Sequence, residues 1–471
     1  MERSEAEAIY DAGREACVEV LLKLSARIEQ LEHRVERLEA ELRRNSENSS
    51  LPPSADSPAA KRRRKGEGKR SGRPPGGQPG HRGSGRRLAP IERVDELVEH
   101  LPRDCSGCGH SLVGAPAIGR PRRHQIAELP EVSVRITEHR LCRRRCPACG
   151  KRIRAELPAE LGRGRFGPRL EAAIAALCGG YRLSRRQIAG LSADLFGLKI
   201  STGAVDAICQ RAGAALERPQ QRLVDAVRGA EALCVDETGW KESGERRALW
   251  GAFTESHAIL RIAETRNRSE ACALLGASEA IVSSDRWWAY DYLDPARRQL
   301  CWSHLVRDFR FHAEGLTHQA RFGERGLQIA EALFAAWHSF QEDGERSRLA
   351  ERIAPLRREL RELLEDGARK SAKTRHHRRF ARNLLKVWPG LWTFVEREGV
   401  EPTNNAAERG LRHAVIARKL SQGSRCEHGK RTTERLLSAA ISCRLQGRSL
   451  FDYLAEVAEA SIRGQPAPAL A

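Results

Sequence analysis

The chain has 471 residues, and its 82 lysines and arginines outnumber its 62 aspartates and glutamates, which gives a formal net charge of +20. This length allows several folded units, and the basic excess points to a polyanionic partner, most simply nucleic acid. No apolar run approaches the roughly 20 residues that span a bilayer, the first residues are polar, and the cysteines are scattered apart from one cluster, so we expect a cytoplasmic protein with reduced thiols and no membrane partner.

Residues 1–48 contain a heptad pattern. Apolar residues recur at alternating steps of three and four, at Leu21, Leu24, Ile28, Leu31, Val35, Leu38 and Leu42. Glutamates and arginines flank this seam, so the pattern predicts a short coiled coil that makes the protein a homodimer or a higher oligomer. The alternative is an amphipathic helix that packs on its own protein.

Residues 49–95 have the composition of a basic, flexible linker. Between positions 61 and 87, eleven lysines and arginines stand against one acid, Glu67. The densest basic run consists of Lys61, Arg62, Arg63, Arg64 and Lys65. We expect this linker to bind DNA phosphates without sequence preference, although a solvated tether would have the same composition.

Residues 96–157 contain two Cys-x-x-Cys pairs, each followed by a glycine. Two such pairs supply the four thiolates of a tetrahedral zinc site, and a site filled by cysteines is closed and therefore structural. We predict a zinc-binding domain of the ribbon type with the ligands Cys105, Cys108, Cys146 and Cys149. Cys142 is an alternative ligand with a less suitable spacing, and four buried thiols without metal are the other alternative.

Residues 160–217 show helical periodicity that is interrupted by a turn at Gly197. The pattern predicts a helix-turn-helix-like domain in which residues 201–212 form the recognition helix. The predicted recognition face is not especially basic, so a three-helix packing unit that does not bind DNA is the alternative.

Residues 228–420 combine short apolar segments with acids that follow them. Strands are predicted at residues 232–235, 248–253, 258–263 and 280–284. A helix at 269–275 precedes the last strand, and the first and last strands lead into Asp236 and Asp285. This order is the opening of a ribonuclease-H-like fold, in which the first and fourth strands lie side by side and bring both carboxylates to one edge.

A third carboxylate is expected because two make a poor two-metal site. Glu408 has apolar neighbours at the i+3 and i+7 positions, Leu411 and Val415. A helix that packs this stripe on the sheet would turn Glu408 toward the two aspartates. The alternative is a capping box, in which Asn405 caps the helix and Glu408 closes its first turn.

The sequence as a whole predicts a multidomain α+β protein. Its parts are an N-terminal coiled coil, a four-cysteine zinc ribbon, a helix-turn-helix and a ribonuclease-H-like α/β catalytic core. Residues from about 311 to 395 are rich in Leu, Ala, Arg and Glu, which predicts a helical insertion within this core. Residues 421–471 are predicted to form a C-terminal helical segment.

Several motifs together resemble the transposases of the insertion sequence 66 family, from the predicted coiled coil almost to the C-terminus. Besides the cysteine pairs, they lie at residues 48–54, 76–83, 235–238, 301–304, 403–409 and 418–419. By this resemblance, Asp236, Asp285 and Glu408 match the family's DDE catalytic triad. One departure is the bulky segment 286–288 after Asp285, where many relatives carry smaller residues.

The resemblance implies a DNA transposase that binds the ends of its element and catalyses metal-dependent strand cleavage and strand transfer. The triad would hold two Mg²⁺ ions, with Mn²⁺ as an alternative, because hard cations prefer oxygen ligands. Basic residues just beyond Glu408 are candidates for contacts with the DNA backbone, although solvated helix charges explain them nearly as well. These residues are Arg409, Arg412, Arg418 and Lys419.

The partners implied are double-stranded DNA, both terminal repeats and target, and any accessory proteins that the element encodes. The protein would then be associated with the bacterial nucleoid. We interpret His304 as a core histidine with a satisfied hydrogen bond, with a place near the metals as the alternative. Two rival functions are a DNA-binding regulator that uses only the N-terminal half, which the intact triad opposes, and a nuclease without strand transfer, which the motifs oppose.

Overall fold

The computed structural model describes residues 10–15, 17–18, 20–22, 27–28, 88–130, 132–158, 161, 164–421 and 423–470. Most of the predicted coiled coil and the basic run at 61–65 lie outside these residues. In the part of the chain that is described, no helix is both long enough and apolar enough to cross a membrane.

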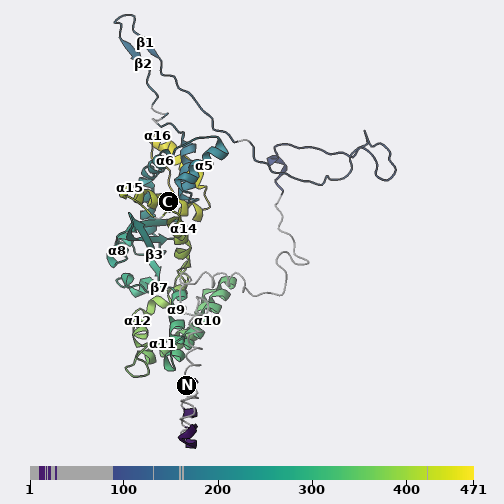
Figure 1. The fold of residues 1–471 in the computed structure, drawn as a ribbon. Helices are drawn as coiled ribbons and strands as arrows, with labels where there is room; N and C mark the ends of the chain where they lie inside the picture. The colour runs from purple at the N-terminus through teal and green to yellow at the C-terminus, as the bar shows by residue number, and fades with distance from the viewer. Residues whose placement is uncertain are drawn as a thin grey trace.

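Residues 88–158 contain little regular structure. They include a short 3-10 helix, η1 (Ile91–Arg93), and a two-stranded antiparallel ribbon of β1 (Arg143–Arg145) and β2 (Arg152–Arg154). Figure 1 shows this ribbon at the tip of a segment that extends away from the helices and the sheet.

Four helices follow, of which the first three lie, with the turn at Gly197, where helices were predicted in residues 160–217. They are α4 (Pro168–Gly179), α5 (Arg185–Phe196), α6 (Thr202–Ala215) and α7 (Glu217–Arg228). A capping box between Ser184 and Gln187 starts α5, and Gly197, with a φ of 62° that favours glycine, ends it. Ser201 caps α6 by accepting a hydrogen bond from the backbone of Ala204. A small apolar core joins α4, α5 and α6 through Ile174, Ile188, Val205, Ile208 and Cys209, whereas α7 packs in the core that contains β3 and β4.

A mixed five-stranded sheet follows, with the strand order β5-β4-β3-β6-β7. Its strands are β3 (Ala232–Glu242), β4 (Glu245–Phe253), β5 (Ala258–Ala263), β6 (Ile281–Ser284) and β7 (Arg298–Leu300). The first three strands pair antiparallel, α8 (Arg268–Leu275) crosses to β6, and β6 runs parallel to both β3 and β7. The four predicted strands and the intervening helix are therefore present in the predicted order.

Strand β7 was not predicted from the sequence, because it is polar and yet buried. Arg298 is 1% exposed, and its guanidinium donates to the carbonyl of Asp285 at 2.7 Å and to the hydroxyl of Ser284 at 3.2 Å. The amide of Gln299 accepts a hydrogen bond from the backbone of Phe394 at 2.8 Å. These partners come from distant segments, so no local apolar pattern marks the strand.

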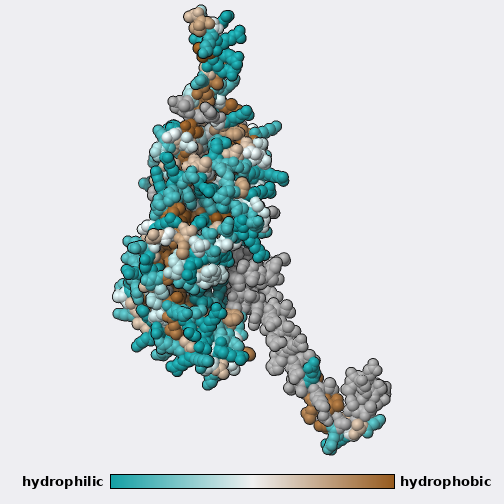
Figure 2. Space-filling view, turned by 90° about the vertical axis from the view of Figure 1, so that its left-hand side faces the viewer, coloured by the Kyte–Doolittle hydropathy of each residue, from teal (hydrophilic) through white to brown (hydrophobic). Residues whose placement is uncertain are grey.

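The residues of the predicted helical insertion do form helices, and these begin directly after β7, at Trp302, earlier than the predicted start near residue 311. Its helices are α9 (Trp302–Ala313), α10 (His318–Asp343), α11 (Arg346–Ala368), α12 (Arg378–Lys386) and α13 (Thr393–Glu396). Its apolar core includes Leu305, Phe309, Phe322 and Leu333 and continues to Leu300 of β7. Gly326 lets α10 lie against α9, because a Cβ at this position would come within 2.1 Å of the ring of Phe309. Outside these cores the surface in Figure 2 is largely hydrophilic.

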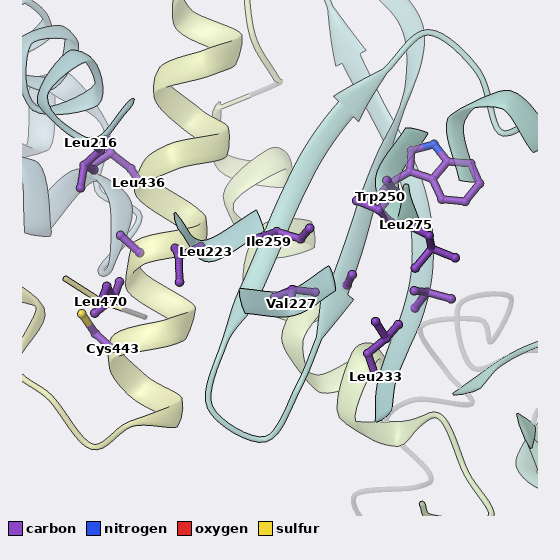
Figure 3. Close-up of a cluster of buried hydrophobic side chains, with 14 of the residues drawn as sticks. Leu216, Leu223, Val227, Leu233, Trp250, Ile259, Leu275, Leu436, Cys443 and Leu470 are labelled. Carbon is purple, nitrogen blue, oxygen red and sulfur yellow. The ribbon is translucent and has the colours of Figure 1, made fainter. Parts of the chain in front are cut away.

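The last helices pack back on the rest of the fold. They are α14 (Asn405–Ser421), α15 (Glu427–Leu445) and α16 (Leu450–Ile462). Leu436 and Cys443 of α15 join the apolar core that contains β3, β4 and α4, whereas Leu437 and Ile441 join α14 on the other face of the sheet. Figure 3 shows Leu436 and Cys443 on this helix, which runs past the strand that carries Ile259. The predicted C-terminal segment is therefore helical and shares its cores with the sheet.

Between these two apolar stripes, α15 presents polar side chains to the outer edge of β5. Three of them accept hydrogen bonds from alternate backbone N–H groups: Glu434 from Ile262 at 2.6 Å, Ser438 from Leu260 at 2.9 Å, and Ser442 from Ala258 at 3.0 Å. The spacings match, because four helical residues rise about 6 Å and two strand residues advance about 6.7 Å. These outward-facing N–H groups of the edge strand therefore have partners, and the strand cannot pair with another chain along this edge.

Glu434 predicts a pH dependence of stability, because burial raises its pKa to about 7. The unfolded chain loses this proton near pH 4.5, so the folded state binds more protons between about pH 4.5 and 7, and stability falls as pH rises through that window. Glu434→Gln keeps an acceptor for Ile262 and removes the titration. We expect a smaller fall in the free energy of unfolding from pH 5 to 8, by at most about 3 kcal/mol and less after solvent screening, in urea titrations.

The matched control is Glu427→Gln, on the first turn of the same helix. Lys430 and Arg431 lower the pKa of Glu427, so this group is ionised throughout the window. Its variant should keep the wild-type slope between pH 5 and 8. A wild-type slope in Glu434→Gln as well would contradict the assignment.

Candidate functional site

Asp236 lies on β3 and faces α14. Successive strand residues point to opposite faces, and Val235 joins the core on the α4 side whereas Trp240 joins the core that contains α14. Asp236 shares the face of Trp240. Burial raises the pKa of its carboxyl to about 8, and the negative charges of Glu237, Asp285 and Glu408 act in the same direction.

Asp285 follows β6, which runs parallel to β3. The last paired residues of these strands are Cys234 and Ser283, so Asp236 and Asp285 stand two residues beyond the same register position. The carboxylate of Asp285 accepts a hydrogen bond from the backbone N–H of Trp287 at 2.8 Å. Burial raises its pKa, although this hydrogen bond and nearby arginines oppose the rise. The structure therefore places both predicted aspartates at equivalent positions just beyond the parallel pairing of β3 and β6. Asp236 lies within β3 and not after it, because antiparallel pairing with β4 continues the strand to Glu242.

Glu408 lies in the first turn of α14, which begins at Asn405. Because Asn405 is already helical, it does not occupy the N-cap position that the capping-box alternative requires. The Glu408 carboxylate lies 3.9 Å from Nε2 of His304, and its charge contributes to the raised pKa of Asp236. Glu408 thus faces the same side of the sheet as the aspartates, as the stripe of Leu411 predicted.

Asn404 connects this helix to the sheet, and the sequence analysis assigned it no role. It is fully buried, and its Nδ2 donates to the carbonyl of Val235, the residue before Asp236, at 2.7 Å. Its backbone N–H donates to the sulfur of Cys301 at 3.2 Å. One residue therefore ties the start of α14 to β3 and to the segment that follows β7. Its place in the 403–409 motif was the available signal.

His304 differs from the expectation of a satisfied core histidine. Its Nδ1 is buried and has no hydrogen-bond partner among the described residues, and its Nε2 faces Glu408. Burial and the charge of Arg307 lower its pKa to about 4, so the ring is neutral at physiological pH. The alternative position, beside the predicted carboxylates, is the one that the structure supports.

Glu237 points away from Asp236 into a second polar network. Its carboxylate accepts hydrogen bonds from the hydroxyl of Tyr290 at 2.7 Å and from the guanidinium of Arg266 at 2.5 Å. The indole of Trp287 donates to the carbonyl of Arg266 at 2.9 Å, and the same guanidinium lies 5.3 Å from the Trp287 ring centroid. This network connects the turn after Asp285 to the residue after Asp236. Arg266 and Tyr290 lie outside the strands and helices predicted from the sequence, so no pattern marked them.

The cations predicted to contact DNA on α14 differ in their surroundings. Arg409, Arg412 and Lys419 are exposed, whereas Arg418 donates a hydrogen bond to the carbonyl of Gly239. Three of the four are therefore available to a ligand as they stand. The basic run at 61–65 lies outside the described residues.

The carboxylate set suits a hard cation by its chemistry. Asp236 is largely buried among other carboxylates, and in the described part of the chain no ion pair involves it. Burial and repulsion between neighbouring carboxylates raise the pKa of Asp236. A bound Mg²⁺ or Mn²⁺ ion, which prefers oxygen ligands, would neutralise these negative charges. The described residues contain no group of three His, Cys, Asp or Glu side chains close enough together to hold one ion as they stand.

The two Cys-x-x-Cys pairs form equivalent turns. Gly109 donates to the carbonyl of Cys105 and Gly150 to that of Cys146, both at 2.9 Å, and both glycines have positive φ angles, of 75° and 71°. Neighbouring backbone N–H groups lower the pKa of the Cys105 and Cys146 thiols, which favours the thiolate that binds metal. The predicted site is thus present as two halves, which the structure does not bring together.

Comparison with known proteins gives the family. Residues 163–432, more than half of the chain, match the model described as transposase IS66 family. The chain belongs to this family of transposases. It is therefore an enzyme that acts on DNA, and the resemblance noted in the sequence is confirmed.

Other parts of this transposase also match known families. Residues 102–150, which include all four predicted zinc ligands, match the zinc-finger binding domain of transposase IS66, and residues 2–87 match a family of unknown function. Two uncharacterized proteins of Sinorhizobium fredii, y4qI and y4jD, are 24% and 23% identical to the chain. These matches cover 80% and 79% of the chain and 74% and 78% of the relatives.

Asn404→Ala should destabilise the transposase. It removes the hydrogen bond to Val235 and leaves that buried carbonyl without a donor, which costs roughly 1–3 kcal/mol. Asn405→Ala, one residue later and less buried, is the matched control and should stay within about 0.5 kcal/mol of wild type. Urea unfolding measures both variants, and equal losses would contradict the anchoring role of Asn404.

Zinc content provides a second test. We expect about one zinc ion per chain, because one tetrahedral site takes four thiolates. Cys105→Ser and Cys149→Ser should each lose the ion, whereas Cys426→Ser, an exposed cysteine elsewhere, should retain it. Elemental analysis of the purified variants is the measurement, and wild-type zinc in Cys105→Ser would exclude that ligand.

Proposed function

We propose that this transposase binds the ends of its element and catalyses strand cleavage and strand transfer at Asp236, Asp285 and Glu408. The observation that carries the proposal is the equivalent position of the two aspartates on parallel strands, with Glu408 on the adjoining helix. The charges of Asp285 and Glu408 both raise the pKa of the buried Asp236 carboxyl. Such a cluster is destabilising unless it binds a cation.

The sheet topology supports a ribonuclease-H-like core for this activity. Three antiparallel strands are followed by a helix and by two strands parallel to the first, and α14 covers one face. In this arrangement the C-terminal end of β6 lies beside the part of β3 that leads to Asp236. The helical insertion 302–396 leaves the sheet after β7 and returns just before α14, so it enters and leaves beside the proposed site.

The proposed ligands of divalent Mg²⁺, or Mn²⁺, are the three carboxylates. When bound, a pair of such ions activates water or a DNA 3′-hydroxyl and stabilises the leaving oxygen. Asn404 would hold Glu408 at a fixed distance from β3, and the network of Glu237 would hold the turn after Asp285. His304 is neutral and faces Glu408, so it adds no repulsion to an incoming cation.

DNA contacts are proposed on several units. The zinc-finger domain, the helices α5 and α6 as a helix-turn-helix, the basic run at 61–65 and the exposed cations of α14 would hold terminal repeats and target DNA. A coiled coil in residues 1–48 would pair two chains and so two element ends. Accessory proteins of the element are further proposed partners, and DNA binding would place the protein at the nucleoid.

The triad is tested with three isosteric variants, Asp236→Asn, Asp285→Asn and Glu408→Gln. Changes to residues that only support metal ligands already cost roughly 10–100-fold, so loss of a ligand should lower cleavage and joining by about 100-fold or more. DNA binding should stay near wild type, because no phosphate-binding cation is removed. Labelled element-end DNA with Mg²⁺ measures binding, nicking and joining separately.

Glu401→Gln is the matched control, an exposed carboxylate seven residues before Glu408. It should retain all three activities. Strand transfer at the wild-type rate in Glu408→Gln would remove this residue from the triad. Nicking by the wild-type protein without any joining would favour a nuclease.

A further inference from the structure

The β1–β2 ribbon concentrates positive charge on one face. Its register pairs Arg143 with Arg154, Arg144 with Ile153, and Arg145 with Arg152. Because side chains alternate along a strand, the first and third pairs share one face and the middle pair lies on the other. All six ribbon residues are exposed. One face of the ribbon therefore consists of two arginine pairs, each directly across the two strands.

This arrangement is unfavourable in the isolated protein. Like charges directly opposite each other destabilise an antiparallel pair. No acid occurs in the sequence from position 139 to 155, and none of the four arginines forms an ion pair among the described residues. Arg145 donates only to the carbonyl of Gly150, at 3.3 Å. The repulsion is thus left for an external anion to neutralise.

The turn of the ribbon is one of the two cysteine knuckles. Cys146 and Cys149 lie between β1 and β2, and the backbone N–H of Cys146 donates to the carbonyl of Lys151 at 2.8 Å, which closes the turn. A metal held at this knuckle would stiffen the ribbon at its tip. Figure 1 shows the ribbon projecting from the rest of the molecule, where a large partner can reach it.

We propose that the four-arginine face of the ribbon, formed by Arg143, Arg145, Arg152 and Arg154, binds the phosphate backbone of duplex DNA. This inference rests on the proposed function, since it assigns the zinc-finger domain a specific DNA-contacting surface. The strands lie about 4.8 Å apart, and same-face residues follow every 6.7 Å or so, which forms a compact block of cations. A DNA duplex carries a comparably dense array of negative charges, one phosphate per roughly 1.7 Å of axis. Its major groove also admits a two-stranded ribbon.

The contact is to phosphates and independent of sequence, so its signature is salt dependence. The slope of log affinity against log salt falls by about 0.9 for each lost phosphate contact. Replacing all four arginines by alanine should flatten the slope by about 3 to 4 for a random-sequence duplex. Fluorescence anisotropy of the full-length, zinc-loaded protein at several KCl concentrations gives this slope.

Two further variants control the experiment. Replacing the same four arginines by lysine keeps the charges and should retain most of the slope. Replacing Arg348, Arg352, Arg369 and Arg463 by alanine removes the same number of charges from exposed arginines that each pair with a carboxylate. This control should change the slope by less than about 1. Zinc content equal to wild type verifies that the finger remains folded in each variant.

The outcomes separate this inference from the proposed function. An unchanged slope in the alanine variant, with zinc retained, would overturn the ribbon contact while the triad variants still test catalysis. An equal loss in the ion-paired control would also overturn it, because net charge alone would then explain the effect. Binding of the ribbon arginines to anionic phospholipid vesicles but not to DNA would assign the surface to a membrane. A wild-type protein that binds the duplex yet never cleaves element ends would leave the ribbon contact standing and remove the proposed function.

Discussion

The parallel pairing of β3 with β6 is the constraint on which the candidate site depends. It sets Asp236 and Asp285 two residues beyond a common register position, so their separation is determined by backbone hydrogen bonds rather than by flexible loops. Asn404 then connects the helix of Glu408 to the carbonyl next to Asp236. A carboxylate from a segment more than a hundred residues away is thereby held against the sheet. The helical insertion between these segments packs its apolar core against the same strands, through Leu300 of β7 and through Ala232 and Ile281.

Two adjacent acids on β3 have opposite electrostatic surroundings. Glu237 is neutralised by Arg266 and by the hydroxyl of Tyr290, as a buried carboxylate in a structural role usually is. Asp236 has no such cation among the residues that the structure describes, and burial together with the surrounding carboxylates raises its pKa to about 8. A buried carboxylate without a neighbouring cation does not stabilise the folded state, whereas a cation-binding site needs such a carboxylate as a ligand. The different surroundings of these two neighbours suit different roles: Glu237 stabilises the structure around the strand, and Asp236 is proposed to act on DNA.

Much of this architecture could be predicted from the sequence, because apolar patterns and turn residues marked the relevant elements. The strand before Asp285, the start of the strand that carries Asp236, the turn at Gly197 and the stripe of Leu411 all depend on local periodicity, and the structure has them in the predicted places. The strand that carries Asp236 is longer than predicted, because its pairing with β4 continues to Glu242. Strand β7 was missed because Arg298 and Gln299 are buried through partners far away in the sequence. Asn404, Arg266 and Tyr290 were missed as site residues for the same reason: a hydrogen bond between distant segments leaves no periodic signal. His304 was placed correctly only as an alternative, since its surroundings depend on the tertiary contact with Glu408.

The polar stripe of α15 has a consequence for the proposed assembly of several copies at paired element ends. Such an assembly would raise the local concentration of the chain, and an unpaired edge strand could then form β-sheet hydrogen bonds with a neighbouring copy. Glu434, Ser438 and Ser442 occupy the groups that such pairing needs. A chain that stopped before α15 would keep all three proposed triad residues but would leave the backbone N–H groups at the outer edge of β5 unpaired. Such shortened copies would tend to aggregate through this edge, so α15 protects the chain from edge-to-edge pairing as well as completing its cores.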